Sequence, residues 1–431
     1  MIRVESLDQE GRGVAHAGGK VIFIEGALPG ETVTYTSFRN KANFEIARVE
    51  AVIEPSAARV VPRCRYFGTC GGCSLQHLDM HAQVAVKQRV LEDSLWHIGK
   101  VRAGTILPAI YGQPWEYRHR ARFSARFVAK KGGALIGFRE KRSSHVAEMA
   151  GCEVVPRRIS LLLAPLRELI GALSIRDRVP QLELAIGEGM DILVLRALQP
   201  PAPEDENLLR QFADRYHVHF FLQLHGPESA QLFYPLHGER PYYRLPEFAL
   251  EIDFAPTDFT QVNHAVNAVL VRRALALLEP LPGERIADMF CGLGNFSLAI
   301  ARRGSRVLGI EGNQRLVASA RANAKTNGLD ALGDFLEADL FQMNSQKFSQ
   351  LGHFDRMLLD PPRDGAIGLV KALTAENAPS RIVYVSCNPA TLARDAAVLV
   401  HAQNYALSAM GIVNMFPHTS HVESIAVFDR Q

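Results

Sequence analysis

The chain has 431 residues, a net charge of +3 and 47% hydrophobic residues, a composition typical of a globular protein with two or three domains. Arg3, Glu5 and Asp8 argue against a signal peptide at this end of the sequence. The most apolar stretch, residues 159–175, contains an Arg-Glu pair and is too short to span a bilayer. We therefore expect a cytoplasmic protein with no membrane partner.

Positive charge is concentrated in one part of the chain. Residues 51–150 contain 16 Lys and Arg against 7 Asp and Glu, whereas the segments before and after them are net acidic. Such an asymmetry predicts a polyanionic partner, such as nucleic acid, at this segment.

Residues 1–55 have the pattern of a small all-β unit. Strand-like runs at 20–24 and 31–36 are separated by Gly and Pro turns, including 28–30. This pattern predicts a five-stranded barrel of the oligonucleotide-binding kind. A plain β-capping domain is the alternative.

Three cysteines lie within ten residues: Cys64, Cys70 and Cys73. In a reducing compartment, clustered thiols bind metal more often than they form disulfides. Cys152 is the candidate fourth ligand, because the other two cysteines fall in the C-terminal part of the chain. The five-residue gap and the distant fourth cysteine favour an iron–sulfur cluster over zinc. Four unrelated buried thiols are the remaining alternative.

The basic segment combines a predicted helix with a predicted strand. The helix covers residues 81–99, with Val84, Leu91 and Leu95 available for one face. In the strand, alternation places four arginines on one face, where they suit phosphate contacts better than burial. A solvated strand face is the alternative. These residues are Arg118, Arg120, Arg122 and Arg126.

From about residue 256, β–α alternation predicts a mostly parallel sheet. A strand at 286–289, a turn with two glycines and a helix at 297–303 form a unit in which the backbone can approach a ligand at the helix N-terminus. Glu311 ends the next strand, where an acidic side chain suits ribose hydroxyls. Asp339 and Asp360 follow the third and fourth strands.

Cys387 follows the apolar strand 381–385, and Asn388-Pro389 ends that strand. The carboxyl ends of parallel strands border the crevice in which open α/β sheets bind ligands. This position alone is weak evidence for a catalytic role, since most isolated cysteines are inert small hydrophobic residues. Glu423 begins the last apolar strand, where a free carboxylate needs a task or a partner. A structural salt bridge is the alternative for Glu423.

The wording of these motifs carries a resemblance. Residues 288–296 (Asp-x-Phe-Cys-Gly-x-Gly-Asn-Phe) resemble motif I of S-adenosylmethionine-dependent methyltransferases. Asp-Pro-Pro-Arg at 360–363, Ser-Cys-Asn-Pro at 386–389 and His-Val-Glu-Ser at 421–424 then make nearly the whole chain resemble the RNA uracil-C5 methyltransferase family. An N-terminal TRAM domain together with the cysteine cluster is typical of the branch that acts on 23S ribosomal RNA.

The resemblance implies a fold and a division of the chain. It implies an α/β fold in three parts: a TRAM domain of oligonucleotide-binding type at 1–55, a central α+β iron–sulfur and RNA-binding domain at 56–255, and a Rossmann-like class I methyltransferase domain at 256–431. The helical region near 82–114 is expected to pack on the catalytic domain. A monomer is expected.

The resemblance also implies roles for individual residues. Cys387 would be the nucleophile that adds to C6 of a single-stranded or loop uridine in 23S ribosomal RNA, and Glu423 the base that resolves the adduct. S-adenosylmethionine would be bound by Gln261, Phe290, Asn295, Glu311, Asp339 and Asp360. A [4Fe–4S] cluster would be held by Cys64, Cys70, Cys73 and Cys152.

The chain departs from some members of this family at two positions, and two other functions are compatible with parts of its sequence. Some relatives carry Asn at the position of Asp339 and Ala at that of Pro362, which makes the contact of Asp339 less certain. A radical-type RNA-modifying enzyme is disfavoured by the cysteine spacing and by the N-terminal position of the barrel. A non-catalytic RNA-binding or redox-sensing protein that keeps the fold is the other alternative.

Overall fold

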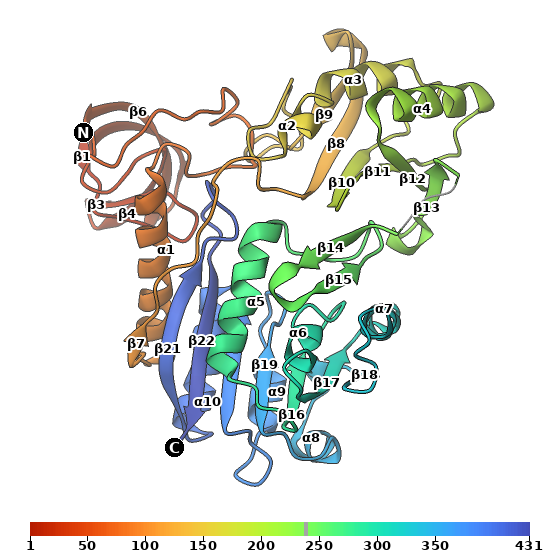
Figure 1. Cartoon of the computed structure of the whole chain (residues 1–431). Coiled ribbons are helices and arrows are strands. Elements are labelled where there is room, and N and C mark those ends of the chain that lie inside the picture. Colours follow the sequence, from red (N-terminus) through yellow and green to blue (C-terminus); the bar gives the residue numbers. More distant parts are fainter. Residues whose placement is uncertain (237–239) are drawn as a thin grey trace.

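The computed structural model describes residues 1–236 and 240–431. Three large β-sheets organise these residues, and Figure 1 shows them as a barrel at the N-terminus, a central sheet and a third sheet at the C-terminus. A short hairpin, β14 (Tyr242–Leu245) and β15 (Leu250–Asp253), lies between the second and third sheets (Figure 1). In the part of the chain that the structure describes, no helix combines the length and apolar character that crossing a membrane would require.

The first sheet closes on itself because one interrupted strand pairs with both of its edges. Ile2 and Arg3 pair with β5, whereas Ser6 and Leu7 pair with β3. The predicted five-stranded barrel is thereby confirmed. Its strands are β1 (Ile2–Arg3), β2 (Ser6–Leu7), β3 (Gly13–Ala17), β4 (Lys20–Glu25), β5 (Thr32–Asn40) and β6 (Phe44–Glu54).

The central unit is a six-stranded sheet in the order β13-β12-β11-β10-β8-β9, with helices packed on it. Leu182 and Leu184 of β10 alternate toward a core that Leu163 and Leu166 of α3 complete. Its elements are β8 (Arg120–Val128), β9 (Gly133–Gly137), α2 (Arg157–Ser160), α3 (Leu163–Ala172), β10 (Gln181–Gly187), β11 (Met190–Arg196), α4 (Pro203–Tyr216), β12 (His219–Gln223) and β13 (Gln231–Tyr234).

The C-terminal sheet has eight strands in the order β18-β17-β16-β19-β20-β22-β21-β7. Strands β16 to β20 are parallel, and β22 runs antiparallel between β20 and β21. Its elements are α5 (His264–Leu278), β16 (Arg285–Met289), α6 (Ser297–Ala301), β17 (Arg306–Glu311), α7 (Gln314–Thr326), β18 (Gly333–Glu337), α8 (Ser345–Gln350), β19 (Arg356–Leu359), α9 (Ile367–Ala372), β20 (Arg381–Ser386), α10 (Pro389–His401), β21 (Tyr405–Val413) and β22 (Glu423–Arg430).

Helices cover both faces of this sheet, so its strands are apolar on both sides. Val383 and Val385 of β20 pack into the core formed with α5, α6 and α7. Ile382 and Tyr384 point to the opposite core, formed with α8, α9 and α10. This is the doubly wound α/β arrangement that the β–α alternation predicts. Three of the predicted boundaries differ: β16 begins at Arg285, α6 ends at Ala301, and β20 ends at Ser386.

Residues 55–79, which we call the cysteine loop, connect β6 to a segment that joins the C-terminal sheet. Helix α1 (Met80–Ser94) packs on α10 and β21, ends in a π-helical turn (Leu95–Gly99), and is followed by β7 (Thr105–Ile106), which pairs with β21. Figure 1 shows α1 running alongside β21. The predicted apolar face is partly wrong. Val84 is only half-buried, whereas the polar side chains of Gln83 and Lys87 are fully buried beside Leu91.

Candidate active site

The register of two strands brings the predicted nucleophile and base together. Ser386 of β20 pairs with Ser424 of β22 in an antiparallel ladder. The ladder ends at this pair, and Cys387 follows Ser386 while Glu423 precedes Ser424, so the two residues lie at the same end of the paired strands. Cys387 is half-buried, and Glu423 is 4% exposed. The thiol and the carboxyl therefore face the same end of the sheet.

The loop after β19 is fastened to the start of α10, next to Cys387. The carbonyl oxygen of Arg363 accepts hydrogen bonds from Asn388 Nδ2 and Thr391 Oγ1, each 3.1 Å long. The buried carboxylate of Asp395 accepts from Ala366 N at 2.6 Å and from Tyr384 Oη at 2.7 Å. These contacts fix the Asp-Pro-Pro-Arg motif against the Ser-Cys-Asn-Pro motif.

Acidic groups dominate the electrostatics of this site. The pKa of the Cys387 thiol is raised to about 12 by burial and by the carboxyls of Glu423 and Asp360, while the Arg363 guanidinium acts in the opposite direction. Burial, reinforced by Asp360, raises the pKa of Glu423 well above its ordinary value. Burial and the nearby carboxyl of Asp288 raise the pKa of Asp360 to about 7. Without a ligand, the site therefore disfavours the thiolate.

A cleft of about 380 Å³ opens beside Cys387, within the range of about 300–1,000 Å³ typical of small-ligand sites. Its walls come from parts of the chain that are distant in sequence: the barrel, the cysteine loop, α1, and the Asp-Pro-Pro-Arg, Ser-Cys-Asn-Pro and His-Val-Glu-Ser motifs. Its lining residues include Gln9, Ser74, Arg363, Cys387, Ser420 and His421.

Motif I forms the turn that the sequence predicts, and Glu311 is attached to it. Gly292 and Gly294 have φ of +54° and +92°, values that favour glycine. Gly292 N donates to Glu311 Oε2 at 3.2 Å. The rings of Phe290 and Phe341 lie 5.7 Å apart, which brings motif I close to the turn that Asp339 caps. Glu311, Phe290 and Asp339 are thus gathered at the carboxyl ends of β16, β17 and β18.

Asn295 already has protein partners. Its Oδ1 accepts from Tyr243 Oη and from Asn267 Nδ2, both at 2.9 Å, and its Nδ2 donates to Asn267 Oδ1 at 3.1 Å. These bonds join motif I to the β14–β15 hairpin and to α5. Asn295 therefore fixes the turn of motif I against the hairpin and α5.

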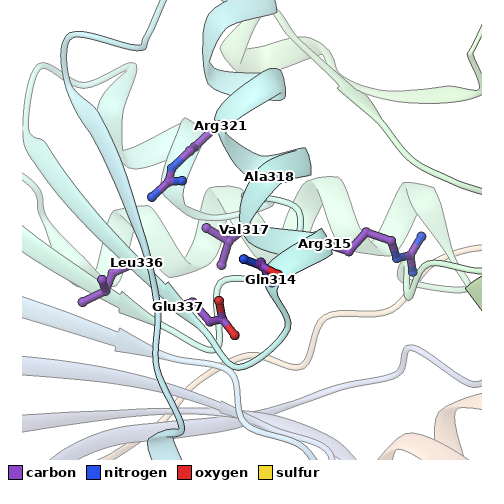
Figure 2. Close-up of a pocket in the computed structure, with 7 residues that line it drawn as sticks. All are labelled: Gln314, Arg315, Val317, Ala318, Arg321, Leu336 and Glu337. Atoms are coloured by element: carbon purple, nitrogen blue, oxygen red, sulfur yellow. The ribbon is translucent and has the colours of Figure 1, made fainter.

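The loop that carries Gln261 is held by two arginines. Arg120 donates to the carbonyl oxygens of Pro256 and Asp258, and Arg315 forms an ion pair with the buried Asp258 carboxylate. In the cavity of about 570 Å³ between α7 and β18, Figure 2 shows Arg315 directed away from the other lining residues. None of the six predicted cofactor residues lines that cavity.

The arginine strand only partly matches its prediction. Arg120, Arg122 and Arg126 do share one face of β8, and Arg122 and Arg126 are exposed. Arg122 forms an ion pair with Glu183. The prediction of four arginines free for RNA is wrong for Arg120, whose guanidinium serves the loop at 256–258. Arg118 lies before β8 and lines a small cavity that the four predicted cluster cysteines also line.

The four predicted cluster thiols line one small cavity, enclosed by Tyr66, Phe67 and Phe138 among others. Burial raises the pKa of Cys73 to about 12 and that of Cys152 to about 11, and neighbouring cysteines in each case add to the shift. Among the residues that the structure describes, no three His, Cys, Asp or Glu side chains converge closely enough to hold a single metal ion. The thiols share a cavity but are spread around it.

Sequence reasoning missed several residues that shape the site. Arg363 was noted only as a motif residue, although it is the positive group facing Cys387. Asp288, fully buried, accepts a hydrogen bond from Ser297 Oγ and raises the pKa of Asp360. Apolar periodicity does not select Gln83 and Lys87 as buried residues of α1, because their side chains are polar. Their four-residue spacing, continued by Leu91, was the available signal.

Comparison with known proteins agrees with this geometry. A family model described as tRNA (Uracil-5-)-methyltransferase matches residues 247–431, and the TRAM domain model matches 1–34. The chain is 59% identical over 430 residues to the 23S rRNA (uracil(1939)-C(5))-methyltransferase RlmD of Nitrosospira multiformis, covering 100% of this chain and 98% of that protein. It is 58% identical to RlmD of Dechloromonas aromatica, covering 99% of each.

The chain belongs to the RlmD family of 23S rRNA (uracil-C5)-methyltransferases. It is therefore an S-adenosylmethionine-dependent methyltransferase with an N-terminal TRAM domain, and the plain β-capping alternative falls away. The fold is also that of Pyrococcus abyssi tRNA (uracil-54, C5)-methyltransferase, solved with S-adenosyl-L-homocysteine, with a TM-score of 0.75, 24% identity and 99% of each chain covered. Family membership also removes the radical-type alternative.

The raised pKa of Asp360 predicts a pH-dependent effect of Asp360→Asn on stability. The pKa is about 7 in the folded protein against an ordinary value of 3.8, so the folded state binds the proton more tightly and wild type loses stability as pH rises between these two values. The variant lacks that loss. Its melting temperature, relative to ligand-free wild type, should therefore be higher at about pH 8 than at about pH 5. Asp364→Asn, at an exposed position in the same loop, is the control, and an equal offset at both pH values would contradict the assignment.

Proposed function

We propose that this protein methylates C5 of one uridine in 23S ribosomal RNA, at the site that its relatives' names give as uracil 1939, through a covalent adduct of Cys387 that Glu423 resolves. The observation that carries the proposal is the β20–β22 register, which supports a thiol and a carboxyl acting on the same base, the thiol at C6 and the carboxyl at C5. We further propose that residues 1–55, 56–255 and 256–431 act as RNA-binding, iron–sulfur and catalytic units.

Uracil C5 is too weak a nucleophile to be methylated without activation, and Cys387 supplies it. The thiolate adds to C6, and the electrons of the C5=C6 bond move toward C5 and O4. S-adenosylmethionine, when bound, supplies the methyl group that C5 takes, and its sulfonium brings a positive charge. Glu423 then removes the C5 proton, the double bond re-forms, and the C6–S bond breaks to release the thiolate.

The charges of the site support this division of labour. Cys387 directly precedes Asn388, the N-cap of α10, and a helix N-terminus stabilises a thiolate. Arg363 adds a positive charge on the same side. Against these stand the carboxyls of Glu423 and Asp360, so a cationic cofactor beside Asp360 would complete the balance. Gln261, Phe290, Asn295, Glu311 and Asp339 are our proposed remaining cofactor contacts.

The surface around the cleft supports an RNA substrate. A groove of about 440 Å³ between the barrel and the cysteine loop shares Gly71, Gly72 and Ser74 with the catalytic cleft. Arg139 and Lys141 line this groove. We propose that an unpaired strand follows it and that its target base leaves the stack to enter the cleft. Arg122 and Arg126, exposed on β8, are further candidates for phosphate contacts.

Four thiols in one cavity fit an iron–sulfur cluster better than a single ion. A cluster separates its thiolate ligands more widely than one metal ion does, which agrees with thiols that share a cavity without converging. Burial, and to a smaller extent the neighbouring cysteines, raise the pKa values of Cys73 and Cys152, so four thiolates there need a bound positive charge. We propose that Cys64, Cys70, Cys73 and Cys152 hold a [4Fe–4S] cluster.

RNA with 5-fluorouridine at the target tests the nucleophile and the base. Wild type should form an adduct that survives denaturing electrophoresis, because fluorine at C5 cannot leave as a proton. Cys387→Ala should form none. With ordinary RNA, Glu423→Gln should accumulate the covalent complex, since the C5 proton stays in place.

Cys291→Ser, at a buried cysteine of motif I, is the matched control and should retain the adduct. An adduct that persists in Cys387→Ala would remove Cys387 from the mechanism. Full multiple turnover by Glu423→Gln would remove Glu423.

The metal content of Cys152→Ser tests the cluster. Anaerobically purified wild type should contain iron and sulfide in equal amounts and absorb broadly in the visible, whereas the variant should lose both signals. Cys291→Ser should keep them. Wild type that contains zinc in place of iron, or no metal at all, would contradict the proposal.

A further inference from the structure

The segment between β21 and β22, residues 414–422, forms one wall of the catalytic cleft. Thr419, Ser420 and His421 line the cleft, and the segment continues directly into Glu423. We call it the β21–β22 loop. Its conformation therefore determines how the Glu423 carboxyl is presented to a base in the cleft.

The cysteine loop holds the middle of the β21–β22 loop. Ser74 N and Leu75 N both donate to the carbonyl oxygen of His418 at 2.9 Å. In return, Ser420 N donates to Ser74 Oγ at 2.9 Å. Ser74 directly follows Cys73, so these bonds connect the four-thiol cavity to the catalytic wall.

A buried glutamine of α1 reinforces this connection. Gln83 has no solvent exposure, and its Nε2 donates to the carbonyl oxygens of Leu75 and Leu78 at 3.1 and 2.8 Å. Its Oε1 accepts from His418 N at 2.8 Å. One side chain thus binds both loops. Lys87, one turn further along α1, donates to Asn414 Oδ1 at 2.7 Å and to Phe416 O at 2.9 Å.

The backbone at His418 shows that the loop is under constraint. His418 has φ of +65°, a left-handed conformation that costs free energy for a residue other than glycine. The Trp115 ring stacks on the His418 ring at 3.9 Å, and Tyr117 Oη donates to Pro417 O at 3.0 Å. Such a conformation persists only when its surroundings impose it, and the cysteine loop and α1 supply most of these contacts.

We propose that Ser74 and Gln83 are positioning residues that fix the β21–β22 loop so that Glu423 reaches the C5 proton. A cluster held by the four thiols would order the cysteine loop and so act, through these bonds, on proton removal rather than on methyl transfer; this part rests on the proposed cluster. This inference rests on the proposed role of Glu423. It assigns the cysteine cavity a task in one particular step of the reaction.

Two labels separate the two steps. Transfer of a labelled methyl group from S-adenosylmethionine reports the first, and release of tritium from [5-³H]uridine in the RNA reports the second. With enzyme in excess over RNA, so that each enzyme molecule turns over only once, we expect tritium release in wild type to keep pace with methyl transfer. In Ser74→Ala, loss of one hydrogen bond should slow tritium release by about two- to tenfold while methyl transfer stays near the wild-type rate.

Conservative and same-helix variants guard against a general folding defect. Ser74→Thr retains the hydroxyl and should restore tritium release. Gln83→Met should slow it more than Ser74→Ala does, because it removes several contacts. Gln88→Met, on the same helix but bonded to Glu92 and Met410, should behave as wild type. Equal slowing of both labels in Ser74→Ala, or unimpaired tritium release in it, would overturn the proposal.

Removal of the cluster provides a measurement that does not depend on activity. When the metal is removed anaerobically by chelation, amide hydrogen exchange in residues 414–422 should increase, while exchange in β16 and β17 should not. Unchanged exchange in 414–422 would contradict the coupling. If Glu423→Gln itself releases tritium normally, the proposed base is wrong; if Glu423→Gln retains tritium but Ser74→Ala does not, only this inference fails.

Discussion

The pairing of β20 with β22 is the constraint on which the site depends. Because β22 runs antiparallel beside β20, the residue after one strand and the first residue of the other meet at the same edge of the sheet. A shift of one residue would turn the Glu423 side chain to the opposite face. The register is specified by apolar side chains that fill cores on both faces, so the packing of β20 and β22 fixes the catalytic geometry.

This arrangement places like charges together, and the surrounding structure balances them. Beyond the effect of burial, Glu423 and Asp360 raise the pKa of Cys387, and Asp360 raises that of Glu423. Arg363 opposes both shifts, and the N-terminus of α10 favours the Cys387 thiolate. The contacts from α10 to the loop after β19 hold Arg363 beside the thiol. A thiol kept protonated until a cationic cofactor binds is protected from wasteful reaction. The raised pKa of Cys387 in the ligand-free site thus agrees with a thiolate that forms only after the cofactor has bound.

Much of the fold and the main reactive residues could be predicted from the sequence, because they depend on local pattern and motif. Strand ends, glycine turns and the barrel follow from periodicity and turn residues. What could not be predicted depends on contacts between distant segments. Arg120 has the same alternating pattern as Arg122 but binds the loop at 256–258, and the polar side chain of Gln83 is buried because its partners lie near residues 75 and 418.

The titration of Cys387 in Glu423→Gln tests the central claim, that the thiol and the carboxyl face each other, most directly. The ionised Glu423 carboxyl adds to burial in raising the pKa of Cys387, which is about 12 in the ligand-free protein. Because the pKa of Glu423 is also raised, Glu423→Gln should lower the pKa of Cys387 most clearly toward alkaline pH, where the wild-type carboxyl is ionised. Alkylation of Cys387 by iodoacetamide, followed by peptide mass spectrometry from about pH 7 to about pH 10, should therefore be faster in the variant. An unchanged rate throughout that range would contradict the pairing of Cys387 with Glu423.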